Sequence, residues 1–174
     1  MTLPAHTDSL FACLAGLGIE TSTVEHPAVF TVEEAKATHD TIPGVHCKNL
    51  FLKDAKGALF LVVCPHDRDI AVNHLHKHLG CKRLSFGKPD LLMEVLRVEP
   101  GSVTPFALIH DAERRVTVIL DSAMMAAPVA NYHPLVNTAT TSIRTADLRL
   151  FLDSLGHEVR DMDLTAAGAA PPTP

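Results

Sequence analysis

Three short segments of the sequence carry polar or basic residues of the kinds that bind ligands or act in catalysis. The first is residues 48–54, KNLFLKD, where alternating apolar residues are typical of a β-strand and Lys48 and Asn49 stand at the entrance. A lysine seldom begins a half-buried strand for packing reasons, because its ammonium must reach water or a partner. The pattern alone leaves open whether the ammonium of Lys48 reaches water or a partner.

The other two segments are the loop 101–105, GSVTP, and residues 131–142, NYHPLVNTATTS. Glycine lets a backbone come close to a ligand, and proline stiffens the loop, so the remaining N–H groups can converge on an oxyanion or a carbonyl oxygen. In the last segment, His133 and Asn137 lie among short polar side chains that must pair with one another or face a ligand if buried. An ordinary turn and a structural polar network are the alternatives.

A metal site is the other chemistry that the sequence suggests. His74 and His78 lie one helical turn apart, a spacing that can clamp a metal ion. No carboxylate stands at the usual offset and Lys77 adds positive charge, so a solvated helix face is favoured. The four cysteines share no C-x-x-C spacing, and no G-x-S-x-G elbow, Walker loop or dinucleotide fingerprint occurs. We therefore expect neither a metal nor another cofactor.

The composition limits the size and the surroundings of the protein. A chain of 174 residues that is 47% hydrophobic can bury one core and is short for two. Its net charge of −5 argues against general DNA binding, although a local basic cluster could recognise the end of a nucleic acid. No apolar run approaches the ~20 residues of a membrane-spanning helix, and the N-terminus does not resemble a signal peptide. With its free thiols, the chain is expected to be cytoplasmic and not membrane-bound.

Hydrophobic periodicity predicts the elements that must position these segments. Residues 1–163 are predicted to form a single α+β domain, with a central mixed or antiparallel twisted β-sheet and flanking helices. Residues 164–174 form an Ala/Pro-rich stretch that is expected to be a disordered tail. Two hairpins are predicted, with strands at 46–54 and 58–63 and at 106–110 and 116–120. The other expected elements are helices at 8–17, 31–39, 69–79, 90–96 and 145–155, and strands at 21–26, 135–136 and 141–143.

Taken together, the segments KNLFLKD (48–54), GSVTP (101–105) and HPLVN (133–137) resemble the signature blocks of the YbaK/ProX aminoacyl-tRNA deacylases. These proteins are relatives of the editing domain inserted in bacterial prolyl-tRNA synthetases. The stretches KNLFLKD, RLSFG (83–87) and GSVTPFAL look closest to the ProXp-ala (PrdX-like) branch, which hydrolyses alanine mischarged onto proline tRNA. The resemblance extends from the first expected helix to about Gly156.

The resemblance implies a pocket for the aminoacyl-adenosine end of a tRNA. Lys48 would line this pocket and be needed for activity, residues 101–105 would form the opposite wall, and His133 would sit nearby. The candidate catalytic residues are therefore Lys48, Gly101, Ser102 and His133. The candidate substrate contacts are Asn49, Val29, Phe30, Ile42, Thr104, Pro105 and Asn137. The candidate contacts to the tRNA are the basic residues Lys53, Lys77, Lys82, Arg83 and Lys88.

The expected function is that of a trans-acting aminoacyl-tRNA deacylase, with Ala-tRNA(Pro) as the substrate. An aminoacyl ester is already reactive, so its hydrolysis needs positioning and charge stabilisation more than a strong nucleophile. The expected partners are a mischarged tRNA, through its acceptor end, and prolyl-tRNA synthetase. The alternatives are the same reaction on cysteine- or serine-charged tRNA, and a non-catalytic tRNA- or nucleic-acid-binding module of the same fold.

Overall fold

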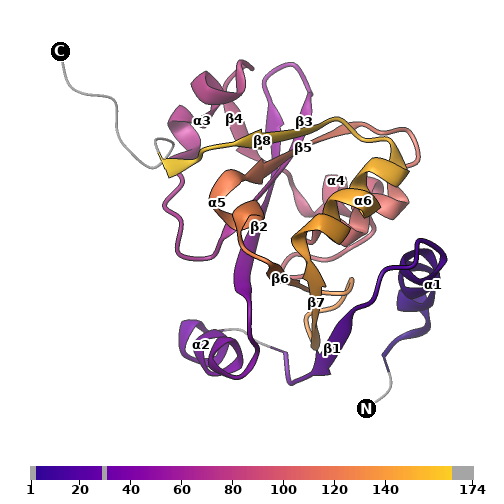
Figure 1. Ribbon diagram of the computed structural model, residues 1–174. Helices are drawn as coiled ribbons and strands as arrows, with labels where there is room; N and C mark the ends of the chain where they lie inside the picture. Colours follow the sequence, from indigo (N-terminus) through magenta and orange to yellow (C-terminus); the bar gives the residue numbers. More distant parts are fainter. Residues whose placement is uncertain (1–2, 29–30, 166–174) are drawn as a thin grey trace.

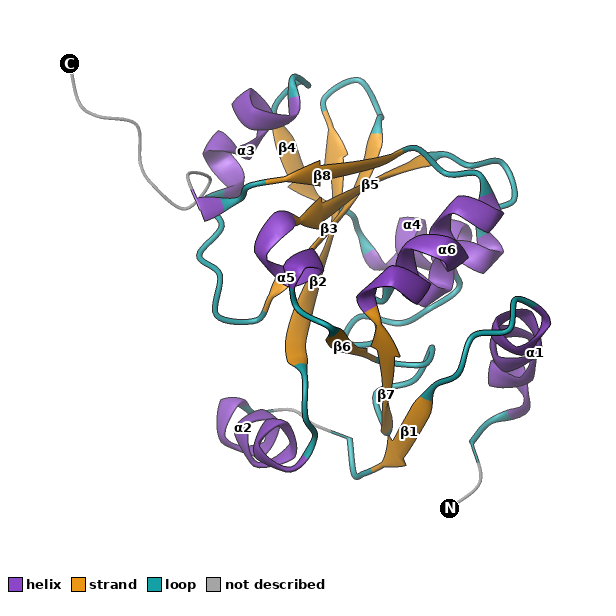
Figure 2. Ribbon diagram, in the orientation of Figure 1, coloured by secondary structure: helices purple, strands orange, loops and turns teal. Residues whose placement is uncertain are grey.

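A mixed β-sheet with helices on both sides forms the framework of the protein, as the computed structural model shows (Figures 1 and 2). The structure describes residues 3–28 and 31–165. The strands are β1 (Ser22–Glu25), β2 (Val45–Asp54), β3 (Leu59–Pro65), β4 (Leu84–Phe86), β5 (Val116–Asp121), β6 (Val129–Tyr132), β7 (Ala139–Arg144) and β8 (Val159–Met162). The α-helices are α1 (Asp8–Gly16), α2 (Val32–Thr41), α3 (Val72–Leu79), α4 (Pro89–Leu96), α5 (Ser122–Ala126) and α6 (Thr145–Leu155), and the 3-10 helices are η1 (Ala5–Thr7) and η2 (Pro105–His110).

The sheet combines parallel and antiparallel pairs, which confirms the predicted α+β class with a mixed sheet. The strand order is β1-β7-β6-β2-β3-β5-β8, and β4 pairs with β2 off this path. Pairs β2–β6, β3–β5 and β5–β8 are parallel. Pairs β1–β7, β2–β3, β2–β4 and β6–β7 are antiparallel.

The hairpin of β2 and β3 confirms the first of the two predicted hairpins. The Asp54 carboxylate accepts the backbone N–H groups of Lys56 and Ala58, both at 2.9 Å. Gly57 adopts a φ of 89°, a conformation that glycine tolerates without a steric penalty. The turn fixes a register in which Lys48 lies opposite Cys64 and Asn49 lies opposite Val63.

Alternate residues of β3 enter two separate hydrophobic cores. Leu61 and Val63 belong to the larger core, to which α1, α4 and α6 contribute. Val62 and Cys64 belong to the smaller core, to which α3 contributes. All four side chains are fully buried, so β3 is covered on both faces, in the way of strands inside parallel sheets.

The second predicted hairpin is wrong. Residues 106–110 lie in η2 and not in a strand, because Pro105 cannot donate to a ladder and the Thr104 hydroxyl accepts the N–H of Phe106 at 3.3 Å. The following strand, β5, pairs in parallel with β3 instead of folding back on its own neighbour. Residues 135–136 do not form a strand either, since Leu135 has a φ of 69°.

The expected helices are present, and the helix expected from residue 69 begins at Val72. The predicted capping box of α2 is formed, since the Thr31 hydroxyl accepts the N–H of Glu34 at 3.2 Å and the Glu34 carboxylate accepts the N–H of Thr31 at 3.0 Å. Leu164, at the start of the expected tail, is buried in the smaller core. Residues 166–174 of that tail lie outside the described residues. Among the described residues, no helix is long and apolar enough to cross a membrane.

Candidate functional site

A short gap in the sheet exposes one edge of β2. Strand β6 pairs with β2 at Val45 and His46, and β4 pairs with it from Leu52 onward, both on the side opposite to β3. Between these contacts, residues 47–50 have no strand beside them on that side in the described structure. The Phe51 carbonyl accepts the N–H of Gly87 there at 2.9 Å, so by the two-residue alternation the backbone groups of Asn49 also point into the gap. This edge offers a donor and an acceptor to a ligand.

Lys48 lies beside this gap with its side chain unpaired. The side chain is partly buried and makes no ion pair or hydrogen bond with any residue that the structure describes. The register places it on the face of the smaller core, opposite Cys64. Burial raises the pKa of the Cys64 thiol to about 11, and the Lys48 ammonium opposes part of that rise. Lys48 therefore presents a positive charge that no described carboxylate neutralises.

Asn49 points to the other face and connects β2 with the loop 101–105. Its Nδ2 donates to the Val103 carbonyl oxygen at 3.1 Å. Its Oδ1 is buried and has no hydrogen-bond partner. A buried acceptor without a donor costs roughly 1–3 kcal/mol of folding free energy. A ligand or water that donates a hydrogen bond to Oδ1 would remove this cost.

A small hollow of about 50 Å³ lies next to Asn49, and a cavity of this size can hold a water molecule. His133 lines it, with its Nδ1–H donating to the Ala139 carbonyl oxygen at 2.9 Å. This bond leaves Nε2 as an acceptor, and burial lowers the pKa of His133, so the imidazole is neutral at pH 7. Two residues that line the hollow therefore each carry an unpaired acceptor, Oδ1 of Asn49 and Nε2 of His133.

Cys47 also lines the hollow but cannot serve as its nucleophile. Burial raises the pKa of its thiol to about 12, so the reactive thiolate is essentially absent at neutral pH. Any bond cleavage in this hollow must therefore use another attacking group, and water is the group that fits its size and polarity.

The loop 101–105 stands across from Asn49. Gly101 has a φ of 91°, and a Cβ atom added there would lie 3.9 Å from Nδ2 of Asn137, so backbone strain rather than crowding requires the glycine. The N–H of Ser102 is already bonded to the Glu99 carbonyl at 3.0 Å. The N–H groups of Gly101 and Val103 have no partner among the described residues. These two remain as candidate donors to a carbonyl oxygen.

The remaining predicted contacts fall into three groups. Ser102 and Asn137 line a neighbouring cavity of about 570 Å³. Thr104 and Pro105 are buried and shape the loop. Ile42 is also buried, and its carbonyl oxygen accepts a hydrogen bond from Nε2 of His46 at 2.8 Å. Val29 and Phe30 lie outside the described residues.

The sequence of this chain matches a known protein family. The family model described as "Aminoacyl-tRNA editing domain" matches residues 26–151. The chain belongs to this editing-domain family. That match includes β2, the loop 101–105 and His133, so the whole candidate site lies inside it.

Individual relatives of this editing domain carry related names. It is 45% identical to "Prolyl-tRNA synthetase associated domain-containing protein 1" of Danio rerio, over 83% of this chain and 79% of the relative. It is 31% identical to "Prolyl-tRNA editing protein ProX" of Acetoanaerobium sticklandii, over 90% of this chain and 96% of the relative. A crystal structure described as a candidate trans-editing enzyme for prolyl tRNA synthetase shares the fold, with a TM-score of 0.71, 20% identity, and coverage of 93% of this chain and 99% of the other. The resemblance found in the sequence is confirmed at the level of the family.

Three histidines, His39, His46 and His66, form a cluster that the sequence pattern did not predict. His39 and His46 line the hollow. The ring of His39 stacks on that of His46 at 4.1 Å and meets that of His66 edge-on at 4.6 Å. Burial, together with the neighbouring imidazoles of His46 and His66, lowers the pKa of His39 to about 4. In the described part of the chain, no group of three His, Cys, Asp or Glu residues is arranged to hold a metal ion. The His39–His46 spacing crosses a helix end, so no helical or strand period marks it in the sequence.

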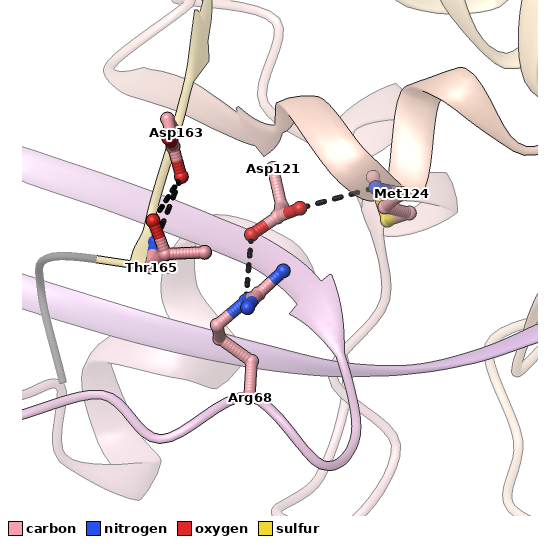
Figure 3. Close-up of polar contacts among 5 residues, drawn as sticks. All are labelled: Arg68, Asp121, Met124, Asp163 and Thr165. Carbon is pink, nitrogen blue, oxygen red and sulfur yellow. Dashed lines mark hydrogen bonds and ion pairs between the residues drawn. The ribbon is translucent and has the colours of Figure 1, made fainter.

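A second polar group lies at the carboxyl ends of β3, β5 and β8. Asp121 accepts a hydrogen bond from Nε of Arg68 at 3.1 Å and caps α5 through the N–H of Met124 at 3.1 Å (Figure 3). Nearby, the Asp163 carboxylate accepts both the N–H and the hydroxyl of Thr165. Asp121 is almost completely buried and bonded to both Arg68 and Met124, so this cluster fixes the segment after β3 and gives the Asp121 carboxylate a partner other than Lys48.

The five basic residues that were predicted to contact tRNA are all exposed. They come from the β2–β3 hairpin, from α3, and from the segment around β4, which lie together at the top of Figure 1. Their position is compatible with contact to a large polyanion; the contact itself stays a prediction. The residues are Lys53, Lys77, Lys82, Arg83 and Lys88.

Proposed function

We propose that the protein is a trans-acting aminoacyl-tRNA deacylase that removes alanine from proline tRNA. The observation that carries the proposal is the pair of unpaired acceptors, Asn49 Oδ1 and His133 Nε2, on two residues that line a water-sized hollow. Lys48, which has no described partner, precedes Asn49 on β2. Such an arrangement suits ester hydrolysis by water, and the thiol at the hollow is too weakly acidic to compete. The family and the names of the relatives support the substrate class.

The proposed reaction begins with a water molecule in the hollow. His133 Nε2 accepts a proton as the water oxygen attacks the ester carbonyl carbon, and Asn49 Oδ1 orients the second water hydrogen. The substrate's own 2′-hydroxyl can assist in this orientation. The N–H groups of Gly101 and Val103 and the Lys48 ammonium stabilise the oxyanion that develops. The tetrahedral intermediate then breaks its bond to the ribose oxygen, which takes the proton back from His133, and the amino acid and the tRNA are released.

Lys48 and Asn49 can act on one ligand because they flank the same exposed edge. Their side chains point to opposite faces of β2, and the gap at residues 47–50 removes the strand that would otherwise separate these faces on one side. A ligand that lies along this edge reaches the ammonium from one face and the amide from the other.

The choice of alanine follows from the energetics of selection. A synthetase site built for proline discriminates weakly against a smaller apolar amino acid, since a missing methylene changes affinity by only about 1–3 kcal/mol. A second pocket that excludes the proline ring by overlap can give a much larger ratio. This finer assignment rests on the resemblance of residues 48–54, 83–87 and 101–108 to the alanine-specific branch.

The test is the loss of ester from a panel of aminoacyl-tRNAs. We expect Ala-tRNA(Pro) to be hydrolysed much faster than Pro-tRNA(Pro), and Ala-tRNA(Ala) to be spared relative to Ala-tRNA(Pro). Equal rates on the alanyl and prolyl esters would contradict the size sieve. A preference for cysteinyl or seryl esters would assign the protein to a different substrate, and no turnover on any ester would favour the binding-module alternative.

A further inference from the structure

Phe86 is a large aromatic side chain that the fold leaves in solvent. It ends β4, and 60% of its surface is exposed. Leu84, two residues earlier on the same face of β4, is buried in the smaller core. The core therefore ends before Phe86, and the exposure of this ring is not explained by packing.

The surroundings of Phe86 are strongly basic in an otherwise acidic protein. Residues 70–89 contain four lysines and arginines, three histidines and no carboxylate, whereas the rest of the chain contains 11 lysines and arginines against 20 carboxylates. Lys82, Arg83 and Lys88 flank Phe86 and are exposed. An exposed aromatic ring among cations is the combination by which proteins hold single-stranded nucleic acid, with the ring stacking on a base and the cations meeting phosphates.

The position of Phe86 relative to the candidate site suggests which nucleic acid it meets. Phe86 pairs with Leu52 of β2, four residues from Lys48 and on the same face of the strand. Four residues of strand span ~13 Å, which is about the length of four stacked nucleotides. The exposed edge at residues 47–50 includes Lys48 and ends just before the Leu52–Phe86 pair.

We propose that Phe86 stacks on a base of the single-stranded 3′ end of the substrate tRNA, a few nucleotides before the terminal adenosine. Lys82, Arg83 and Lys88 neutralise the adjacent phosphates. This inference rests on the proposed deacylase function and adds a residue that holds the RNA away from the reacting ester. Phe86 and Lys88 also line a groove of about 410 Å³ between β4 and α4. The carboxylates of Asp90 and Glu94 line the same groove and disfavour RNA on its α4 side, so the proposed contact is with Phe86 and the cations of residues 82–88.

A direct test uses the absence of tryptophan from the natural chain. Phe86→Trp places a single fluorophore at the proposed contact, and a single-stranded RNA oligonucleotide ending in CCA is the probe. We expect its fluorescence to be quenched on titration with the RNA, and less strongly at high salt. Leu150→Trp, at an exposed position on α6, is the matched control and should not respond.

Equal responses of the two variants, or no response of Phe86→Trp, would overturn the proposal. Quenching by a polyglutamate peptide but not by the RNA would also overturn it, in favour of an acidic protein partner. This measurement needs no catalysis, so it decides the inference even if the wild-type protein hydrolyses no ester.

A kinetic test separates RNA contact from chemistry. Phe86→Ala and Phe86→Leu should lower kcat/KM on full-length Ala-tRNA(Pro) by roughly 5- to 150-fold, the range that loss of one stacked base gives. Both variants should hydrolyse the alanyl ester of adenosine at the wild-type rate, because that substrate lacks the stacked nucleotide. Wild-type kinetics on the full tRNA, or an equal loss on both substrates, would refute the contact, whereas a wild type that is inactive on both would refute the proposed function instead.

Discussion

The two strands of the β2–β3 hairpin differ in how completely their edges are paired and their polar groups are hydrogen-bonded. Strand β3 has β2 on one side and β5 on the other, and its central side chains are fully buried on both faces. On the side away from β3, strand β2 has no neighbouring strand at residues 47–50 in the described structure. It carries there a lysine without a described partner and an asparagine whose Oδ1 accepts no hydrogen bond. Buried polar groups are normally paired, so the deviation on β2 is the reason why the proposed chemistry is assigned to that strand, and β3 is the support that holds it in register.

The largest effect is expected for a cavity in the supporting strand. Leu61→Ala should reduce the free energy of unfolding by about 2–5 kcal/mol, because Leu61 is fully buried in the larger core. Denaturant unfolding followed by circular dichroism measures this loss. A reduction below about 1 kcal/mol would show that β3 does not bear the stability of the sheet.

The opposite result is expected on the other strand. Lys48→Met keeps the apolar stem but removes the ammonium, so it should slow deacylation by roughly 100-fold while the unfolding free energy changes by less than about 1 kcal/mol. Single-turnover deacylation and denaturant unfolding are measured on the same preparation. Unchanged hydrolysis would remove Lys48 from the mechanism.

A matched pair of glycines tests the loop. Gly101 and Gly57 have nearly equal φ angles, 91° and 89°, and neither would crowd an added Cβ atom. Valine at either position should cost similar stability, since the strain comes from the backbone. Only Gly101→Val should lose at least tenfold in deacylation rate, because only that loop faces the site. Equal activity in the two variants would reduce the loop to an ordinary turn.

The smallest expected effect concerns pH. Burial lowers the pKa of His133, so the neutral, proton-accepting form persists below the usual histidine range, and protonation at still lower pH should remove activity. Deacylation should therefore be constant around neutral pH and fall only in more acidic buffers. His133→Gln should be slower and should lose this acidic limb. If the wild-type rate already declined between pH 8 and about pH 7 as the buffer was made more acidic, the pKa of His133 would not be lowered.

Local patterns were sufficient to predict the hairpin of β2 and β3 and the capping box of α2, because both depend on residues close together in the chain. The partner of β5 could not be predicted this way, since parallel pairing with β3 joins residues 57 positions apart, such as Leu59 and Val116. Residues 106–110 form a short apolar run that also suits a buried strand. Pro105 and the Thr104 cap favour a 3-10 helix instead.

The same distinction holds for the candidate site. Lys48, Gly101 and His133 could be named from their residue types and from the family resemblance. The Asn49–Val103 hydrogen bond, which joins residues 54 apart, and the stack of His39 on His46 depend on tertiary contacts that no local period reveals.

The gap beside β2 also affects solubility. An unpaired strand edge invites another chain to add a strand, which is a common route to aggregation. Here the open edge is only four residues long, is closed at its ends by β6 and β4, and carries the charge of Lys48. It is too short and too polar to template a strand, yet long enough for a few nucleotides. A change that detached β4 from residues 52–54 would lengthen this edge, so the protein would lose its protection against self-association together with the edge at which binding is proposed.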